Sequence, residues 1–178
     1  ELITTRVTSH IALRNVADAI DIDGVVNAIR LANDTLISAG TTRPRIGVAA
    51  LNPHAGDDGN FGTEEIDILA PAIEKARRMQ IDVDGPWPSD TVFLRGRDGK
   101  LDAVVTMYHD QGQIAMKMMG FDRGVTIAAG LPVPVATPAH GTAFDIAGKG
   151  VANLNATRKA FDILCRMGVN FRRSRMAA

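Results

Sequence analysis

Three histidines in this chain each follow a run of apolar residues. His10 follows residues 2–8, His54 follows residues 46–51, and His109 follows residues 101–107. Apolar, β-branched runs that stop at polar or turn residues predict buried strands. If these strands lie side by side in one sheet, all three imidazoles reach one edge of it. Three neutral imidazoles suit Zn²⁺, Co²⁺ or a similar divalent ion, although three unrelated loop histidines would show the same spacing.

The third histidine lies in a sequence of four side chains that can all take part in chemistry. Tyr108, His109, Asp110 and Gln111 stand in a row before Gly112. Tyr108 and Asp110 are candidate proton carriers. Asp110 is also a candidate for holding a ring nitrogen of a metal-bound histidine. A histidine and an aspartate after a strand also describe a simple hydrogen-bonded loop pair.

The elements that must position these residues alternate along the chain. Strands are expected at residues 2–8, 46–51, 91–94, 101–108 and 125–128, and helices at residues 21–40, 63–76, 113–119 and 151–168. Residues 52–62 predict an irregular loop because they are rich in Gly, Asn and Asp, and residues 85–90 predict a rigid turn because they hold two prolines. The proline-rich residues 131–138 do not suit a central strand. The pattern predicts an α/β domain with a largely parallel sheet and helices on both faces.

Composition excludes several classes of protein. The 178 residues are 46% hydrophobic and 22% charged, which is typical of a soluble globular chain. Twenty basic residues balance twenty acidic ones, so no net charge attracts nucleic acid or an anionic membrane. We expect no membrane span and no secretory leader. The single Cys165 cannot form an intrachain disulfide and is expected in a helix core, which favours a reducing, cytoplasmic location.

Five segments of the chain together resemble the 4-hydroxythreonine-4-phosphate dehydrogenase (PdxA) family. They are residues 8–14, residues 51–56 with 61–65, residues 85–91, residues 107–112 and residues 140–148. The resemblance implies that His10, His54 and His109 bind a divalent metal, with Zn²⁺ expected first and Co²⁺ or Mg²⁺ as alternatives. It also implies a fold like that of the isocitrate and isopropylmalate dehydrogenases, and a homodimer whose site lies at the subunit interface.

The resemblance also implies a division of the chain. Residues 1–130 would form the metal- and substrate-binding lobe that also makes the dimer, and residues 131–178 would return into the nucleotide-binding lobe. The second lobe would be incomplete, because the family is longer and its N-terminal part would lie before Glu1.

By the same resemblance, NAD or NADP oxidises a secondary alcohol and the resulting β-keto acid loses CO₂. Lys117 aligns with the substrate-binding lysine of the family and, with Asp110, is a candidate catalytic residue. Taken alone, Lys117 is a surface lysine on a helix. His140, Gly141, Asp145 and Asn153 would line the NAD(P) site, although without the resemblance they describe only a glycine-rich loop before a helix.

Two positions depart from the family pattern. Members that act on 4-phosphohydroxy-L-threonine, in pyridoxal phosphate biosynthesis, carry Asn where this chain has substrate-binding candidate Thr126, and Arg where it has Val135. Valine cannot replace the bidentate, permanently charged guanidinium as an anion partner. A cis-dihydrodiol dicarboxylate dehydrogenase, such as that for terephthalate dihydrodiol, is therefore an alternative. A non-catalytic metal-binding dimerisation lobe is another, and a hydrolytic zinc site is a weaker one.

Overall fold

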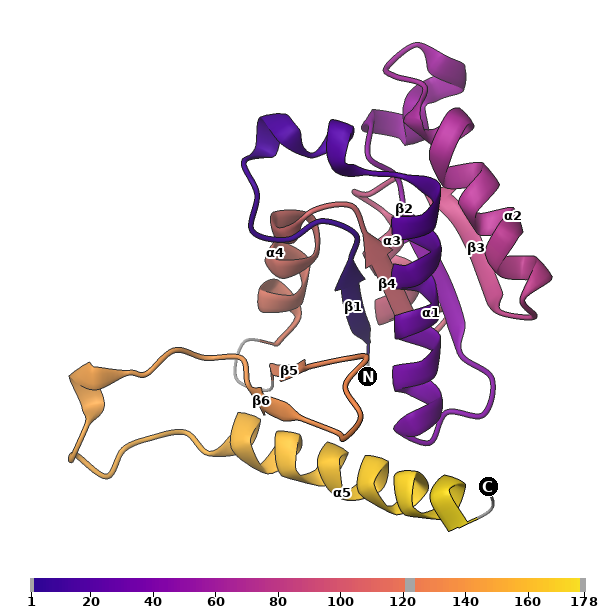
Figure 1. Cartoon of the computed structure of the whole chain (residues 1–178). Helices are drawn as coiled ribbons and strands as arrows, with labels where there is room; N and C mark the ends of the chain where they lie inside the picture. The colour runs from indigo at the N-terminus through magenta and orange to yellow at the C-terminus, as the bar shows by residue number, and fades with distance from the viewer. Residues whose placement is uncertain (1, 121–123, 177–178) are drawn as a thin grey trace. The chain divides into compact units, whose positions relative to one another are not determined.

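The structure is a computed structural model that describes residues 2–120 and 124–176. Two compact units make up the chain (Figure 1): Glu1–Ile37 with Thr41–Ala115, and Ser38–Gly40 with Met116–Ala178. This division does not coincide with the boundary expected at residue 130. The assignment of the two parts to substrate and nucleotide stays a prediction.

The first unit is built on a four-stranded sheet in which every neighbouring pair of strands is parallel. The strands are β1 (Ile3–Arg6), β2 (Arg45–Ala49), β3 (Asp82–Trp87) and β4 (Ala103–Thr106), in the spatial order β1-β4-β2-β3. Three of them confirm strands expected from the sequence. Because the strands are parallel, their carboxyl ends all lie at one edge, and β1 and β4 end there as neighbours.

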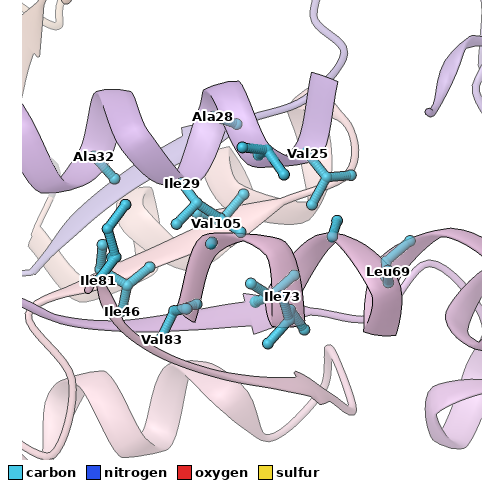
Figure 2. Close-up of a cluster of buried hydrophobic side chains, with 14 of the residues drawn as sticks. Val25, Ala28, Ile29, Ala32, Ile46, Leu69, Ile73, Ile81, Val83 and Val105 are labelled. Atoms are coloured by element: carbon cyan, nitrogen blue, oxygen red, sulfur yellow. The ribbon is translucent and has the colours of Figure 1, made fainter. Parts of the chain in front are cut away.

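Helices cover both faces of this sheet, as expected. On one face, α1 (Ile22–Ser38) and α2 (Ala70–Arg78) pack against side chains of the strands, and Ile46, Val83 and Val105 belong to the same buried cluster as Ile29 and Ile73 of these helices (Figure 2). On the other face, Val104 packs with Val92 of α3 (Val92–Arg97). Adjacent residues of β4 therefore point to opposite faces of the sheet, as the alternation of side chains along a strand requires.

The prediction for residues 85–94 was wrong in two respects. Residues 85–87 of the expected turn form the end of β3, which tolerates Pro86 because it is an edge strand, and the chain turns only at residues 89–91. The expected strand is helix α3, in which the N–H of Val92 donates to the carbonyl of Pro88. Gly96 is buried one turn after Val92, where a Cβ would lie 2.6 Å from a methyl carbon of Leu2.

The second unit contains a small antiparallel sheet of β5 (Val125–Ile127) and β6 (Ala136–Pro138), with α5 (Asn155–Met176) packed on both strands. The buried stripe of α5 consists of Ala156, Ala160, Ile163 and Met167. Cys165 lies off this stripe and is exposed, so its expected place in a helix core was wrong. Among the described residues, no helix has the length and apolar character that crossing a membrane requires.

The loop between β2 and α2 carries His54 and has an unusual backbone. Residues 54–58 all have positive φ, from 45° to 82°. Each non-glycine residue in this conformation costs roughly 1–2 kcal/mol. The loop is held by Glu65, which opens the π-helical turn η4 (Glu65–Leu69) and is only 3% exposed. Its Oε1 accepts hydrogen bonds from the N–H groups of Leu51 at 2.8 Å and Asn52 at 2.7 Å.

Replacing Glu65 tests whether this carboxylate holds the loop. We expect Glu65→Ala to lower the free energy of unfolding by about 2–3 kcal/mol, because two backbone donors lose their acceptor. Glu65→Gln keeps one oxygen acceptor and should lose less. Urea unfolding measures both, with Asp67→Ala in the same turn as an exposed control. Equal losses for Glu65→Ala and Asp67→Ala would contradict this role.

A second prediction concerns the ion pair that joins β2 to the start of β4. The Arg45 side chain donates to both carboxylate oxygens of Asp102, at 3.0 and 2.9 Å. The side-chain hydrogen bond from Arg45 lowers the pKa of Asp102 below its ordinary value. The resulting stabilisation is present above the ordinary aspartate pKa and is lost as pH falls through the lowered folded value.

We therefore expect Asp102→Asn to be less stable than the parent chain at pH 7 by about 1 kcal/mol, a figure reduced for solvent screening. The difference should shrink below about pH 4. Urea unfolding as a function of pH measures it. Asp98→Asn is the control, since within the described residues that carboxylate pairs with its exposed sequence neighbour Arg97 alone. A difference that stays constant down to pH 2 would exclude this origin.

Candidate functional site

His10 and His109 meet at the carboxyl edge of the sheet. Their ring centroids lie 5.3 Å apart, with the ring planes tilted by 43°. His10 follows β1, and His109 is the first residue of α4 (His109–Gly120), which begins earlier than the helix expected at residue 113. The neighbouring positions of β1 and β4 bring these two rings together.

Each ring has its Nδ1 atom engaged by a nearby side chain. His109 Nδ1 lies 2.6 Å from Asp110 Oδ1, and His10 Nδ1 lies 3.2 Å from Ser9 Oγ, which accepts a hydrogen bond from Arg6 Nε. When His109 Nδ1 carries the proton toward Asp110, its Nε2 presents a lone pair. Carboxylate–histidine pairs of this kind orient the ring in metal sites. The arrangement of His109 and Asp110 therefore fits a cation ligand.

A pocket of ≈ 250 Å³ opens beside the two rings. Its lining includes Ser9, Tyr108 and Asp110 as well as the two histidines, and the apolar side chains Ile11 and Leu13. Tyr108 is half-buried and packs against the hydrophobic core between the sheet and helices α1 and α2. This packing holds the polar residues next to Tyr108 in place. The pocket offers space for a small polar ligand beside the imidazoles.

The strand ends at this edge are joined by side-chain hydrogen bonds that the sequence did not predict. Thr8 Oγ1 donates to the carbonyl of Met107 at 2.7 Å. Gln111 accepts from the N–H of Met107 at 2.7 Å and donates to the carbonyl of Ala50 at 2.7 Å. The sequence marked Gln111 as one of four side chains that can take part in chemistry, and Thr8 as a strand residue that opens the first family segment, but it predicted neither of these bonds.

His54 is placed apart from this pair on the loop after β2. Its ring is exposed and lies 6.1 Å from the ring of Phe61, centroid to centroid. Within the described residues, no group of three or more His, Cys, Asp or Glu side chains is arranged to hold a metal ion. The structure thus brings together two of the three expected ligands, and the three-histidine site stays a prediction.

The expected substrate residues lie in the second unit. Lys117 is exposed in the last turn of α4. Thr126 of β5 is exposed and pairs with Thr137 of β6, and the N–H of Ala128 donates to the carbonyl of Val135. Val135 is exposed as well. The two positions that depart from the family pattern therefore belong to one small hairpin.

The expected cofactor segment is also exposed. His140 Nδ1 lies 2.9 Å from the carbonyl oxygen of Gly141, and Asp145 lies in the short helix η6 (Phe144–Ile146). Asn153 Oδ1 accepts from the N–H of Asn155 at 2.9 Å and so caps α5. This capping role was missed in the sequence, although Asn before a helix is its usual signal. A cofactor-binding role for these residues stays a prediction.

Comparison with known proteins adds a family to this geometry. The family model described as pyridoxal phosphate biosynthetic protein PdxA matches residues 1–164. A relative from Pseudomonas aeruginosa, provisionally named 4-hydroxythreonine-4-phosphate dehydrogenase 2, is 61% identical over 170 residues, which cover 94% of this chain and 50% of the relative. A D-threonate 4-phosphate dehydrogenase from Pectobacterium atrosepticum is 51% identical over 146 residues, covering 82% of this chain and 45% of that protein.

Solved structures show the same fold. A 4-hydroxythreonine-4-phosphate dehydrogenase from Klebsiella pneumoniae is 44% identical with a TM-score of 0.78, over 94% of this chain and 50% of that one. A terephthalate 1,2-cis-dihydrodiol dehydrogenase from Burkholderia xenovorans is 31% identical with a TM-score of 0.75, over 93% and 52%. The chain spans about half the length of the curated relatives it matches. With nearly its whole length matched by the family model and by these relatives, the chain belongs to the PdxA family.

Proposed function

We propose that this chain carries the metal- and substrate-binding part of a dehydrogenase that oxidises the secondary alcohol of a phosphorylated hydroxy acid with NAD or NADP. The observation that carries the proposal is the His10–His109 pair, with Asp110 on the His109 ring, at the carboxyl edge of a parallel sheet. The isocitrate dehydrogenase-like arrangement of two lobes, the homodimer and the decarboxylation are parts of the same proposal.

His10 and His109 would hold a divalent ion through their Nε2 atoms, with His54 as the expected third ligand. Such an ion supplies Lewis-acid polarisation of an alcohol or carbonyl oxygen. Asp110 keeps the proton of His109 on Nδ1 and fixes the direction of the ring. Lys117 would bind the substrate anion and exchange a proton with it, and Asp110 is the second candidate proton carrier.

A phosphorylated substrate is better supported than a dihydrodiol. The relatives named for phosphorylated substrates are 61% and 51% identical to this chain, whereas the dihydrodiol dehydrogenase structure is 31% identical. Two substrates fit these names, 4-phosphohydroxy-L-threonine and D-threonate 4-phosphate. Because Val135 offers no charge, the phosphate must find its cation elsewhere, and Lys117 is the candidate that the family resemblance provides.

Reduction of the cofactor tests the proposed reaction. The purified 178-residue chain, supplied with Zn²⁺, Co²⁺ or Mg²⁺ and with NAD or NADP, should form reduced cofactor with one of the two phosphorylated substrates. Terephthalate cis-dihydrodiol is offered in parallel. Turnover of the dihydrodiol alone would overturn the proposed substrate class. Metal binding without turnover of any of the three would favour the non-catalytic lobe instead.

Metal affinity tests the ligands separately from turnover. We expect His10→Ala and His109→Ala each to weaken Co²⁺ binding by at least about tenfold, and Asp110→Asn by about tenfold, because outer-shell partners contribute on that scale. The visible absorption of bound Co²⁺ reports the affinity. His140→Ala is the matched histidine control and should bind as the parent chain does. An equal effect in His140→Ala would contradict the assignment of the ligands.

A further inference from the structure

The peptide groups of Met107 are held from both sides at the end of β4. Its side chain is fully buried in the main core. Its N–H donates to Gln111 Oε1 at 2.7 Å, and its carbonyl accepts from both the N–H of Thr8 at 3.0 Å and Thr8 Oγ1 at 2.7 Å. The side chain of Met107, its N–H group and its carbonyl group are therefore all held in place.

Gln111 is itself fixed by the neighbouring strands. Its Nε2 donates to the carbonyl of Ala50, which directly follows β2, and to Ser89 Oγ, which follows β3, at 2.7 and 2.8 Å. Ser89 Oγ in turn donates to the carbonyl of Ala50 at 2.5 Å. A single carboxamide thus connects the carboxyl ends of β4, β2 and β3 inside the first unit.

These contacts lie directly beside the histidine pair. Thr8 precedes His10 by two residues, and Met107 precedes His109 by two residues. The regular pairing of β1 with β4 ends at Arg6 opposite Thr106. Beyond that point, the N–H groups of Val7 and Thr8 donate to the carbonyls of Thr106 and Met107, and the side chains of Thr8 and Gln111 add bonds to Met107 just before each histidine.

We propose that Thr8 and Gln111 are positioning residues that determine the distance between the His10 and His109 rings and their relative orientation. Thr8 bonds the end of β1 to the carbonyl of Met107. Gln111 bonds to the N–H of Met107 and, through its amide nitrogen, to the residues that follow β2 and β3. Neither side chain needs to touch the substrate. The part of this inference that concerns metal affinity rests on the proposed function, whereas the part that concerns the distance between the rings does not.

The test uses variants of nearly unchanged shape. Thr8→Val removes the hydroxyl but keeps the N–H bond to Met107, Thr8→Ser restores a hydroxyl, and Gln111→Met removes the carboxamide. Thr106→Val is the matched control, because the hydroxyl of Thr106 is also buried and joins the same two strands, donating to the carbonyl of Thr5 at 3.0 Å. Thr106 lies inside the regular ladder, and within the described part of the chain its hydroxyl donates to the carbonyl of Thr5 and, at 3.5 Å, to that of Tyr108, but not to Met107.

Two readouts separate positioning from general stability. The first is the proton NOE between the two imidazole rings in the metal-free full chain, and the second is Co²⁺ affinity with its visible spectrum. We expect Thr8→Val and Gln111→Met to weaken the NOE and to lower Co²⁺ affinity about tenfold. Thr8→Ser and Thr106→Val should retain both, even where urea unfolding shows that Thr106→Val is as destabilised as Thr8→Val.

The proposal is overturned if Thr8→Val and Gln111→Met keep the parental NOE and affinity, or if Thr106→Val loses them to the same extent. If the parent chain does not bind Co²⁺, the proposed metal function fails, and the NOE series alone decides the positioning role. If Thr8→Val does not fold, Gln111→Met is compared with Thr106→Val in its place.

Discussion

The parallel pairing of β1 with β4 is the constraint on which the candidate site depends. Parallel strands end at the same edge of a sheet, so the residues that follow neighbouring strands are delivered side by side. β4 is able to serve as the central strand because Val104 and Val105 are fully buried on opposite faces. The same register that buries these side chains brings His10 within 5.3 Å of His109, centroid to centroid. Core packing and the placement of the two histidines therefore depend on the same pairing of β1 with β4. A shift of one residue in this pairing would disrupt both.

Much of this arrangement could be predicted from the sequence, because its signals are local. Apolar runs of strand length marked β1, β2 and β4, and helical spacing marked α1 and α5. The failures lie around residues 85–94, where tertiary contacts outweigh local preference. Pro86 is accommodated at an edge strand, and the guanidinium of Arg95 in α3 lies 3.9 Å from the ring centroid of Trp87. A β-branched and aromatic segment whose composition favours a strand is thus a helix, and its Val92 packs on Ala49 and Val104, which are distant in the sequence or in the next strand.

The candidate site was predictable in its residue types and less so in its geometry. The Gly- and Asp-rich sequence after β2 indicated an irregular loop, but it did not show that the residues leading to His54, Leu51 and Asn52, are bonded to the buried carboxylate of Glu65 in the following turn. Thr8 and Gln111 bond to backbone groups of other segments, and such contacts leave no periodic pattern in a sequence. A motif can therefore show which side chains are present at a strand end without showing what holds them there.

The histidine pair and the two positions that depart from the family pattern belong to different units of the chain. The histidine pair depends on the buried β1–β4 ladder of the first unit, whereas Thr126 and Val135 are exposed on the β5–β6 hairpin of the second. Substitutions at exposed positions usually change folding free energy by less than about 0.5 kcal/mol. Substitutions at these two hairpin positions are therefore expected to cost little folding free energy, whereas the histidine pair follows strands whose side chains build the core. Relatives of this chain are named for different substrates, and solved structures named for different substrates share its fold.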